Sequence, residues 1–231
     1  MSKHKPDGRK SSHHKRALHS YDRRPGNRIP GQCILIVCEG AETEPNYFES
    51  LRRYLKLSTI RVAIIDRAGA PIGVIEEAQA QAKKRKRGIR NNPTNTPQIE
   101  AIWCVFDVEN PHYNQTFDRA VQIADQNGFR LAISNPAFEF WYVLHFEHTT
   151  RPFSDGNDIK KYLERHLPGY HPAMSVFDAL ISSTQIAVRN AKQILENHPQ
   201  SDCRFPNPST LVHLLVEKMI EMSPSGREHL K

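Results

Sequence analysis

The chain has 231 residues, of which 38% are apolar and 25% are charged, and its formal net charge is +7. This length and composition fit one globular domain with appendages, and they exclude a collagen, a small disulfide scaffold and a repeat array. The longest apolar runs, at 33–38 and 101–106, are far shorter than the roughly 20 residues that cross a bilayer. Residues 1–28 contain no hydrophobic signal core, so we expect a cytoplasmic protein with no membrane partner.

The positive charge is concentrated at the start of the chain. Residues 1–30 contain nine Lys or Arg and two Asp, whereas the remaining 201 residues contain 23 basic and 23 acidic side chains. Because this segment is highly charged and poor in apolar residues, we predict a disordered basic tail over 1–30. Such a tail attracts nucleic-acid phosphates regardless of base sequence, although a merely solubilising tail has the same composition.

Apolar periodicity predicts alternating strands and helices over residues 31–150. The predicted strands are buried runs at 33–38, 61–66, 99–106 and 130–133. The predicted helices lie at 46–57, 72–87, 116–127 and 137–146. Thr43 is the expected N-cap of the first helix, and Gly88 and Gly128 are the expected ends of the second and third. This alternation implies βαβ crossovers, and hence an α/β domain with a four-stranded parallel sheet flanked by helices.

A second basic cluster lies at the end of the predicted helix 72–87. It consists of Lys83, Lys84, Arg85, Lys86 and Arg87. Closely spaced lysines and arginines on one helix bind phosphate backbones through counterion release. We therefore interpret the cluster as a nucleic-acid-binding surface, with a solvated helix end as the simpler alternative.

From residue 151 the pattern changes to helices separated by proline-containing linkers. The predicted helices lie at 158–166, 176–197 and 209–222. We interpret 151–231 as a helical extension packed on the sheet of the domain at 31–150. The four cysteines of the chain form no CxxC pair, so we expect neither a disulfide framework nor a zinc site.

Carboxylates follow the first and third predicted strands directly. Glu39 follows strand 33–38, Asp107 follows strand 99–106, and Glu109 comes two residues later. The active crevice of an open parallel sheet forms beyond the carboxyl ends of its strands. Three carboxylates that converge without basic partners repel one another, and a hard cation such as Mg²⁺ or Mn²⁺ relieves the repulsion. We expect such a metal site here, with solvated loop carboxylates as the alternative.

Glycine and further glutamates surround this predicted edge. Gly40 allows the backbone to pass close to a metal-bound phosphate. Glu42 and Glu44 are close enough in sequence to reach the crevice, although acidic residues in the first turn of a helix also interact favourably with the helix dipole. Glu139, on the predicted helix 137–146, is expected near the mouth of the crevice.

Three other polar residues are candidates for the lining of the site. Ser134 and Asn135 follow the fourth strand, where the default interpretation is an N-cap with Pro136 as the first helical residue. His145 lies on an apolar helix, where a packed, hydrogen-bonded histidine competes with a catalytic one. Asp66 ends the second strand, and the sequence suggests no partner for it.

Several of these segments together resemble one known family. They are VCEGAETEPNYF at 37–48, WCVFDVE at 103–109, SNPAFEFW at 134–141, HF at 145–146 and NPST at 207–210. In this order and spacing they resemble the RloB-like proteins of bacterial defence loci, over about residues 33–220. RloB-like proteins are in turn similar to the Toprim fold of topoisomerases, primases and OLD-family nucleases.

The resemblance implies a Toprim-like core and roles for three carboxylates. Glu39 corresponds to the Toprim glutamate, and Asp107 and Glu109 correspond to the acidic pair. The chain departs from the Toprim pattern at Glu109, because the second residue of that pair is an aspartate in Toprim domains. A longer carboxylate still binds Mg²⁺.

The resemblance also implies an activity and partners. It implies a Mg²⁺-dependent nuclease that hydrolyses DNA or RNA as an effector in phage defence, beside an ATPase of the ABC/SMC-like type. The alternative is a non-catalytic subunit of the same shape that binds nucleic acid or docks on the ATPase as a sensor. A regulatory domain that binds a small phosphorylated ligand is a third interpretation.

Overall fold

The computed structural model describes residues 33–58, 60–64, 70–91, 99–108, 115–197 and 204–223. The predicted basic tail at 1–30, and the carboxylates Asp66 and Glu109, lie outside the described residues. The strands are β1 (Cys33–Cys38), β2 (Ile60–Ile64), β3 (Ile99–Asp107), β4 (Arg130–Asn135) and β5 (Ser209–Thr210). The helices are α1 (Thr43–Tyr54), α2 (Pro71–Asn91), α3 (Gln115–Asn127), α4 (Glu139–Val143), α5 (Gly156–Leu163), α6 (Phe177–Leu180), α7 (Thr184–Glu196) and α8 (Val212–Met222).

The strands form one sheet in the order β2-β1-β3-β4-β5. The first four in this order are parallel, so the predicted α/β class and its four parallel strands are confirmed. The prediction that a helix begins at residue 209 is wrong. Ser209 and Thr210 instead form a fifth strand that pairs antiparallel with Asn135 and Ser134, and α8 begins after it.

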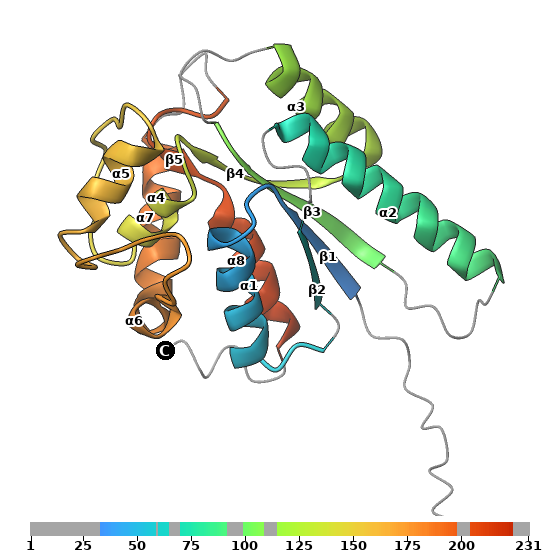
Figure 1. The fold of residues 1–231 in the computed structure, drawn as a ribbon, viewed down its shortest axis with the longest axis horizontal. Helices are drawn as coiled ribbons and strands as arrows, with labels where there is room; N and C mark the ends of the chain where they lie inside the picture. Colours follow the sequence, from blue (N-terminus) through green and yellow to red (C-terminus); the bar gives the residue numbers. More distant parts are fainter. Residues whose placement is uncertain are drawn as a thin grey trace, which may run out of the picture.

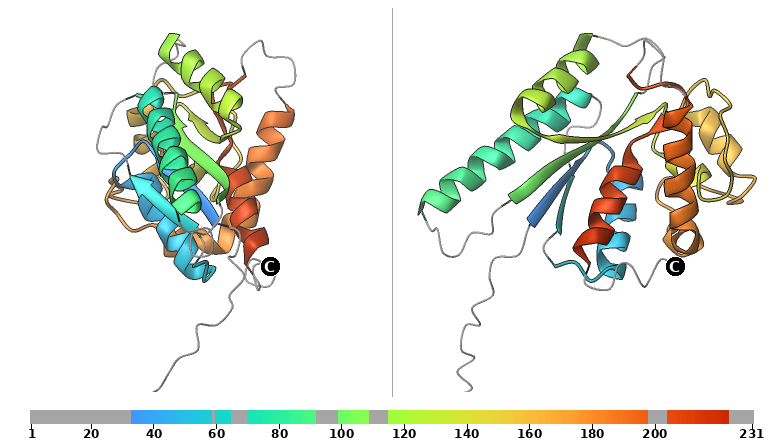
Figure 2. Two further views of the ribbon diagram at one scale, coloured as in Figure 1. Left: turned by 90° about the vertical axis from the view of Figure 1, so that its right-hand side faces the viewer. Right: turned by 180° about the vertical axis from the view of Figure 1, so that it is seen from behind.

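The two faces of the sheet carry separate apolar clusters, as expected for strands that are covered on both sides. Ile34 and Ile36 of β1 belong to one cluster, and Leu35 and Val37 belong to the other. The first cluster joins β1 to α1 and to the helices from α4 to α8, and the second joins it to α2 and α3. Figures 1 and 2 show α2 and α3 on one side of the sheet and α1 and α8 on the other. Residues beyond 151 therefore share a core with α1.

Two predicted helix boundaries on the first half of the chain are wrong. Thr43 is not an N-cap, because α1 already begins at Thr43 and its N-cap position is Glu42, which makes no side-chain capping bond. Gly88 does not end α2, which continues to Asn91. One glycine costs a helix interior only about 1 kcal/mol, too little to stop a helix of 21 residues. The prediction that α3 ends at Gly128 is confirmed, and Gly128 has φ +68°.

Two further predictions about helices need correction. Ser134 and Asn135 do not cap a helix, because they are the last residues of β4, and α4 begins only at Glu139. The predicted helix 176–197 is divided into α6, a 3₁₀ turn at Ile181–Ser183 and α7. Serine competes with helical hydrogen bonding through its hydroxyl, which favours a break at the Ser182-Ser183 pair.

Three cysteines lie within the described residues. Cys33, Cys38 and Cys104 are buried and free. Burial raises the pKa of Cys104 to about 12, so this thiol is unreactive at neutral pH. None of the helices in the described ranges combines the length and apolar character that a membrane crossing requires.

Candidate functional site at the carboxyl edge of the sheet

The backbone ladders of the sheet bring Glu39 and Asp107 together. The Glu39 amide donates to the carbonyl of Val105 at 3.0 Å and so extends the β1–β3 pairing by one residue. On the other side of β3, the Val108 amide donates to the carbonyl of Ser134 at 2.8 Å. Both carboxylates therefore lie where the central strands end, which is where ligands bind in open parallel sheets.

Asp107 has the most unusual surroundings of these carboxylates. Its amide donates to the Glu39 carboxylate oxygen Oε2 at 3.2 Å. Its own carboxylate oxygen Oδ1 is buried and has no hydrogen-bond partner among the described residues. A buried, unsatisfied carboxylate oxygen costs free energy unless a proton or a cation occupies the position beside it.

Glu44 lies in the same place, and its neighbour Glu42 does not. The side chain of Glu44 is buried, and its Oε1 accepts a hydrogen bond from the Gly40 amide at 3.3 Å. A Cβ at position 40 would overlap the Glu44 carboxylate, so glycine is required for this close approach. Glu42 is exposed to solvent and lies outside the cleft.

Glu139 brings a further carboxylate from the first turn of α4. Its side chain is buried, and its Oε1 accepts a hydrogen bond from the Tyr170 hydroxyl at 3.2 Å. Lys160 Nζ lies 3.8 Å from the same oxygen. Lys160 comes from α5, where Ile159 and Leu163 are buried against the core and leave Lys160 on the side of the cleft.

These side chains line one cleft with a volume of about 350 Å³. The lining residues are Glu39, Gly40, Thr43, Glu44, Asp107, Pro136, Ala137, Phe138, Glu139, Gly156, Asn157 and Lys160. The cleft thus contains four carboxylates and one ammonium group. Its acidic side comes from the sheet, α1 and α4, and its basic and amide side comes from α5.

The cleft holds the pKa of Asp107 well above its usual range. Burial is the largest cause, and the charge of Glu44 is the next. Glu139 and Glu39 raise this pKa further, and a backbone hydrogen bond at Phe138 lowers it. The protein alone therefore stabilises the negative charge of Asp107 poorly.

The neighbouring glutamates show the same pattern more weakly. Burial raises the pKa of Glu44, and the charge of Glu139 adds to this effect. Burial also raises the pKa of Glu139, whereas the charge of Lys160 lowers it. Lys160 acts on Glu44 and Glu139, and the described lining of the cleft therefore has an excess of negative charge that a bound cation would offset.

The raised pKa of Asp107 predicts a gain in stability when the charge is removed. Because the folded state binds this proton more tightly than the unfolded state, Asp107 lowers the free energy of unfolding as pH rises from its ordinary pKa through the raised one. We expect Asp107→Asn to melt at a higher temperature than the parent chain in EDTA at pH 7–8. The difference should shrink as the pH falls below the ordinary pKa of an aspartate, about 3.9, because Asp107 then becomes protonated in both states.

Thermal melts across this pH range measure the effect. Glu42→Gln is the matched control, because it removes one exposed carboxylate from outside the cleft. An equal gain for both variants, or a gain that does not depend on pH, would contradict the electrostatic account.

The donor set of the cleft fits a hard divalent cation. Within the described ranges, no three His, Cys, Asp or Glu side chains are grouped closely enough to hold a metal ion by themselves. Mg²⁺, however, usually keeps several waters and is held by one or two carboxylates together with substrate phosphates. Glu39 and Asp107, with the unpartnered Oδ1, provide such a pair.

Ser134 and Asn135 lie beside the cleft but do not line it. Their side chains hold the C-terminal segment, because the Ser134 and Thr210 hydroxyls are hydrogen-bonded at 2.9 Å and Asn135 Nδ2 donates to the carbonyl of Phe205 at 2.7 Å. The NPST segment at 207–210 thus supplies the strand that covers this edge of β4.

His145 is a core residue in the structure. It is buried, and its Nδ1 lies 2.9 Å from the carbonyl oxygen of Trp141. Its ring packs at an angle of 79° to the Trp141 ring. Burial lowers the pKa of His145 to about 4, so the imidazole is neutral at physiological pH, and it does not line the cleft.

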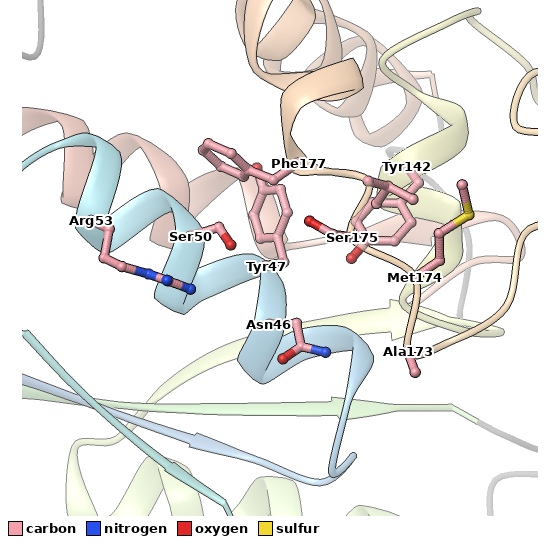
Figure 3. A pocket seen from close by; sticks show the side chains of 10 residues that line it. Asn46, Tyr47, Ser50, Arg53, Tyr142, Ala173, Met174, Ser175 and Phe177 are labelled. Atoms are coloured by element: carbon pink, nitrogen blue, oxygen red, sulfur yellow. The ribbon is translucent and has the colours of Figure 1, made fainter.

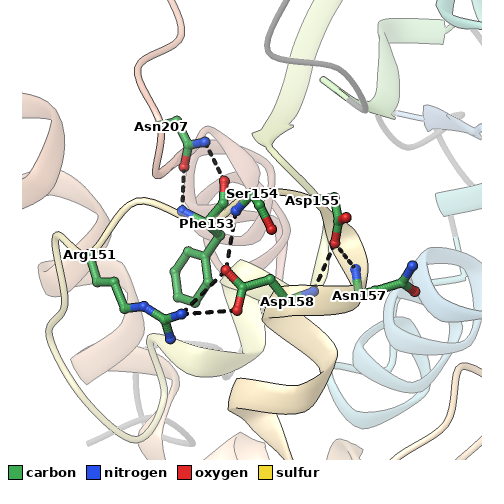
Figure 4. Close-up of polar contacts among 7 residues, drawn as sticks. All are labelled: Arg151, Phe153, Ser154, Asp155, Asn157, Asp158 and Asn207. Carbon is green, nitrogen blue, oxygen red and sulfur yellow. Dashed lines mark hydrogen bonds and ion pairs between the residues drawn. The ribbon is translucent and has the colours of Figure 1, made fainter.

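Asn207 positions the segment that leads into α5. The Phe153 amide donates to Asn207 Oδ1 at 3.1 Å, and Asn207 Nδ2 donates to the Phe153 carbonyl at 2.7 Å (Figure 4). The side chain of Asn207 thus satisfies both the amide and the carbonyl of Phe153, as a neighbouring β-strand would. The NPST segment therefore contacts both the end of β4, through Ser209 and Thr210, and the segment that leads into α5, through Asn207.

The first turn of α5 is then fixed by its own capping bonds. The Asp155 carboxylate accepts hydrogen bonds from the amides of Asn157 and Asp158 at 2.8 and 2.9 Å (Figure 4). Arg151 Nη2 donates to Asp158 Oδ1 at 2.9 Å. These contacts hold Asn157 and Lys160 at the cleft. The expectation that site residues directly follow the strands did not identify Asn157 or Lys160. These residues lie on α5, which does not follow a strand directly and reaches the cleft only through tertiary packing.

The basic cluster lies near the amino ends of the strands, at the opposite end of the sheet from the cleft. Lys83, Lys84, Lys86 and Arg87 are exposed, and Arg85 Nη1 donates to Cys33 Sγ at 3.5 Å. Cys33 begins β1, a strand of six residues that spans about 20 Å, and the cleft lies at its other end. Figures 1 and 2 show the end of α2 extending beyond the amino ends of β1 and β3.

The fold and the site define an α/β protein with an acidic cleft at the carboxyl edge of a parallel sheet. The family model described as RloB-like protein matches residues 34–219, which is most of the chain. The chain therefore belongs to the RloB-like family. No curated protein and no solved structure matches it.

Proposed function

We propose that the protein is a Mg²⁺- or Mn²⁺-dependent nuclease with a Toprim-like core, which hydrolyses phosphodiester bonds of DNA or RNA in the acidic cleft. The observation that carries this proposal is the buried Oδ1 of Asp107, which has no hydrogen-bond partner among the described residues and belongs to a residue whose amide donates to the Glu39 carboxylate. Phosphodiesters and divalent cations suit such a site, because their charges offset the excess of carboxylates. Membership of the RloB-like family supports the same reading.

Glu39 and Asp107 are the residues that would hold the cation, and we propose Glu109 as a third ligand from outside the described residues. The chemistry that bound Mg²⁺ or Mn²⁺ supplies is polarisation of the phosphate and activation of water. Hydrolysis adds the oxygen of water to phosphorus, breaks one P–O ester bond and releases a proton. We propose that Glu39 accepts that proton where it does not act as a ligand.

Lys160 and Asn157 are proposed to bind the phosphate from the other side of the cleft. Lys160 Nζ lies 3.8 Å from Glu139 and has three donor hydrogens, so contact with Glu139 leaves donors for an anion. Asn157 is exposed and also lines the cleft. The chain thus places cation-binding and anion-binding groups on facing sides of one cleft.

One observation favours a second candidate, a non-catalytic subunit that binds nucleic acid or docks on a partner. The basic cluster at the end of α2 lies at the other edge of the sheet from the cleft. A nucleic-acid strand that is bound only at the basic cluster would not reach the carboxylates of the cleft. The role in phage defence and the ABC/SMC-like ATPase partner are common to the two candidates. This role and this partner rest on the family resemblance.

Metal-dependent cleavage distinguishes the two candidates. We expect the purified full-length protein, with its cognate ATPase and nucleotide present, to cleave members of a panel of DNA and RNA substrates in Mn²⁺ or Mg²⁺ but not in EDTA. Glu39→Gln should lose this activity and still show a cooperative melting transition in EDTA. If no substrate is cleaved in any metal under these conditions, the enzyme proposal is wrong and the docking candidate replaces it.

A further inference from the structure

A second pocket lies beside the acidic cleft, separated from it by one contact. Thr43 lines the cleft, and its carbonyl accepts a hydrogen bond at 3.3 Å from the hydroxyl of Tyr142, which lines the second pocket. Asn46 of this pocket is three residues along α1 from Thr43, a rise of about 5 Å. The cleft and this pocket therefore lie along the same first turns of α1.

The walls of the pocket combine an aromatic floor with a polar rim. Figure 3 shows Arg53, Ser50 and Tyr47 of α1 on one side, Phe177 next to Tyr47, and Tyr142 with Ser175 and Met174 on the other side. The rings of Tyr47, Tyr142 and Phe177 are buried, and Tyr47 and Phe177 meet edge to face with 6.0 Å between their centroids. Rings this deeply buried offer the pocket only a small part of their surface, and another aromatic ring packs on such a part in a T-shaped contact.

The rim supplies hydrogen bonds and one positive charge. Asn46 and Ser175 are exposed, Ser50 is half-buried, and all three line the pocket with polar side chains. Arg53 also lines it, and its Nε donates to the backbone carbonyl of Glu49 at 3.2 Å. Among the described residues, no carboxylate lines the pocket, in contrast to the cleft. The rim is therefore suited to an anion and to the polar edge of a heterocycle.

We propose that this pocket binds one unpaired nucleotide of the substrate strand, with the base over the aromatic floor and a flanking phosphate at Arg53. The volume of about 230 Å³ is below the range of about 300–1,000 Å³ that is usual for drug-sized ligands, and it suits a single small ring system. A base enters such a pocket only from a single strand or after leaving a duplex. This inference rests on the proposed function, because it assigns the substrate as single-stranded or locally unpaired nucleic acid.

Strand binding by three variants of the full chain tests the proposal. Ser175→Phe fills the pocket from its exposed rim, and Arg53→Ala removes its charge. Arg52→Ala is the matched control, because Arg52 lies on the same helix, pairs with Glu49 at 2.8 Å and does not line the pocket. All three keep the N-terminal tail and the basic cluster, so differences between them isolate the pocket. Binding is measured in EDTA by fluorescence anisotropy with a labelled single strand, the same sequence as a duplex, and a mononucleotide.

We expect Ser175→Phe and Arg53→Ala each to weaken single-strand binding about tenfold, with duplex binding and the melting temperature unchanged and with Arg52→Ala behaving like the parent. Parent-like single-strand binding by both pocket variants would overturn the proposal. Binding of the mononucleotide without binding of the strand would also overturn it, in favour of a free nucleotide ligand. If strand binding depends on the pocket but no nucleic acid is cleaved, the nuclease proposal alone fails. Normal cleavage and strand binding by both pocket variants would instead reject the pocket alone.

Discussion

Asp107→Asn is expected to abolish metal-dependent cleavage. The substitution removes a ligand from the cleft and replaces the unpartnered Oδ1 by an amide or carbonyl group that binds cations poorly. Changes to residues that merely support a metal ligand cost about 10–100-fold in activity, so the loss of a ligand should exceed this range. The measurement is the initial rate of cleavage in Mn²⁺ for the parent and the variant.

The same rate measurement includes Glu42→Gln as the control. Glu42 precedes α1 by one residue, is exposed and lies outside the cleft, so its loss should leave the rate within about twofold of the parent. Because Asp107→Asn is also expected to stabilise the metal-free protein, a loss of activity cannot be ascribed to unfolding. Retention of most of the activity by Asp107→Asn would place catalysis elsewhere.

Mn²⁺ is expected to raise the melting temperature of the parent chain. A cation that binds only the folded state stabilises it by about 2.7 kcal/mol at a concentration one hundred times its dissociation constant. For a chain of this length, each kcal/mol corresponds to roughly 2–4 °C. Glu39→Gln and Asp107→Asn should lose most of this increase, whereas Glu42→Gln should keep it.

Differential scanning fluorimetry over a range of Mn²⁺ and Mg²⁺ concentrations measures this effect, with EDTA as the reference. Two opposing contributions make Asp107→Asn informative, since it should melt above the parent in EDTA and lose its advantage when Mn²⁺ is added. The same increase in all variants would show that the cation binds at another place on the protein.

The positions of Glu39 and Asp107 could be predicted from the sequence, because each residue lies at the end of an apolar run and parallel strands end at the same side of a sheet. The buried apolar runs of β1 and β3 fix where these strands end, and parallel pairing brings their carboxyl ends to the same edge. Glu39 and Asp107 therefore had to lie near each other, and the 3.2 Å contact between the Asp107 amide and the Glu39 carboxylate agrees with this expectation.

The same rule misplaced the last two residues of β4. Ser134 and Asn135 are at a strand end, but β5 pairs with them and directs their side chains to the C-terminal segment instead of the cleft. The β5 pairing joins residues about 75 positions apart, and a strand of two residues has no periodicity from which to predict it. Local pattern alone therefore favoured a helix cap.

Lys160 shows a second limit of sequence patterns. The amphipathic character of α5 predicts a helix and its buried side, with Ile159 and Leu163 facing inward. It does not predict which part of the protein the opposite side meets. That information comes from the Asn207–Phe153 bonds and the Asp155 cap, which set the position of the helix relative to the sheet.

The central claim of this account is that Glu39 and Asp107 hold a divalent cation in the cleft. Anomalous diffraction from crystals soaked in Mn²⁺ tests it most directly, because Mn²⁺ scatters anomalously and replaces Mg²⁺ in oxygen sites. The account predicts an anomalous peak about 2.1–2.2 Å from Asp107 Oδ1 and in contact with a Glu39 carboxylate oxygen, and no such peak in crystals of Asp107→Asn. A parent structure without a peak in the cleft, with the two carboxylates unobstructed by crystal contacts, would contradict it.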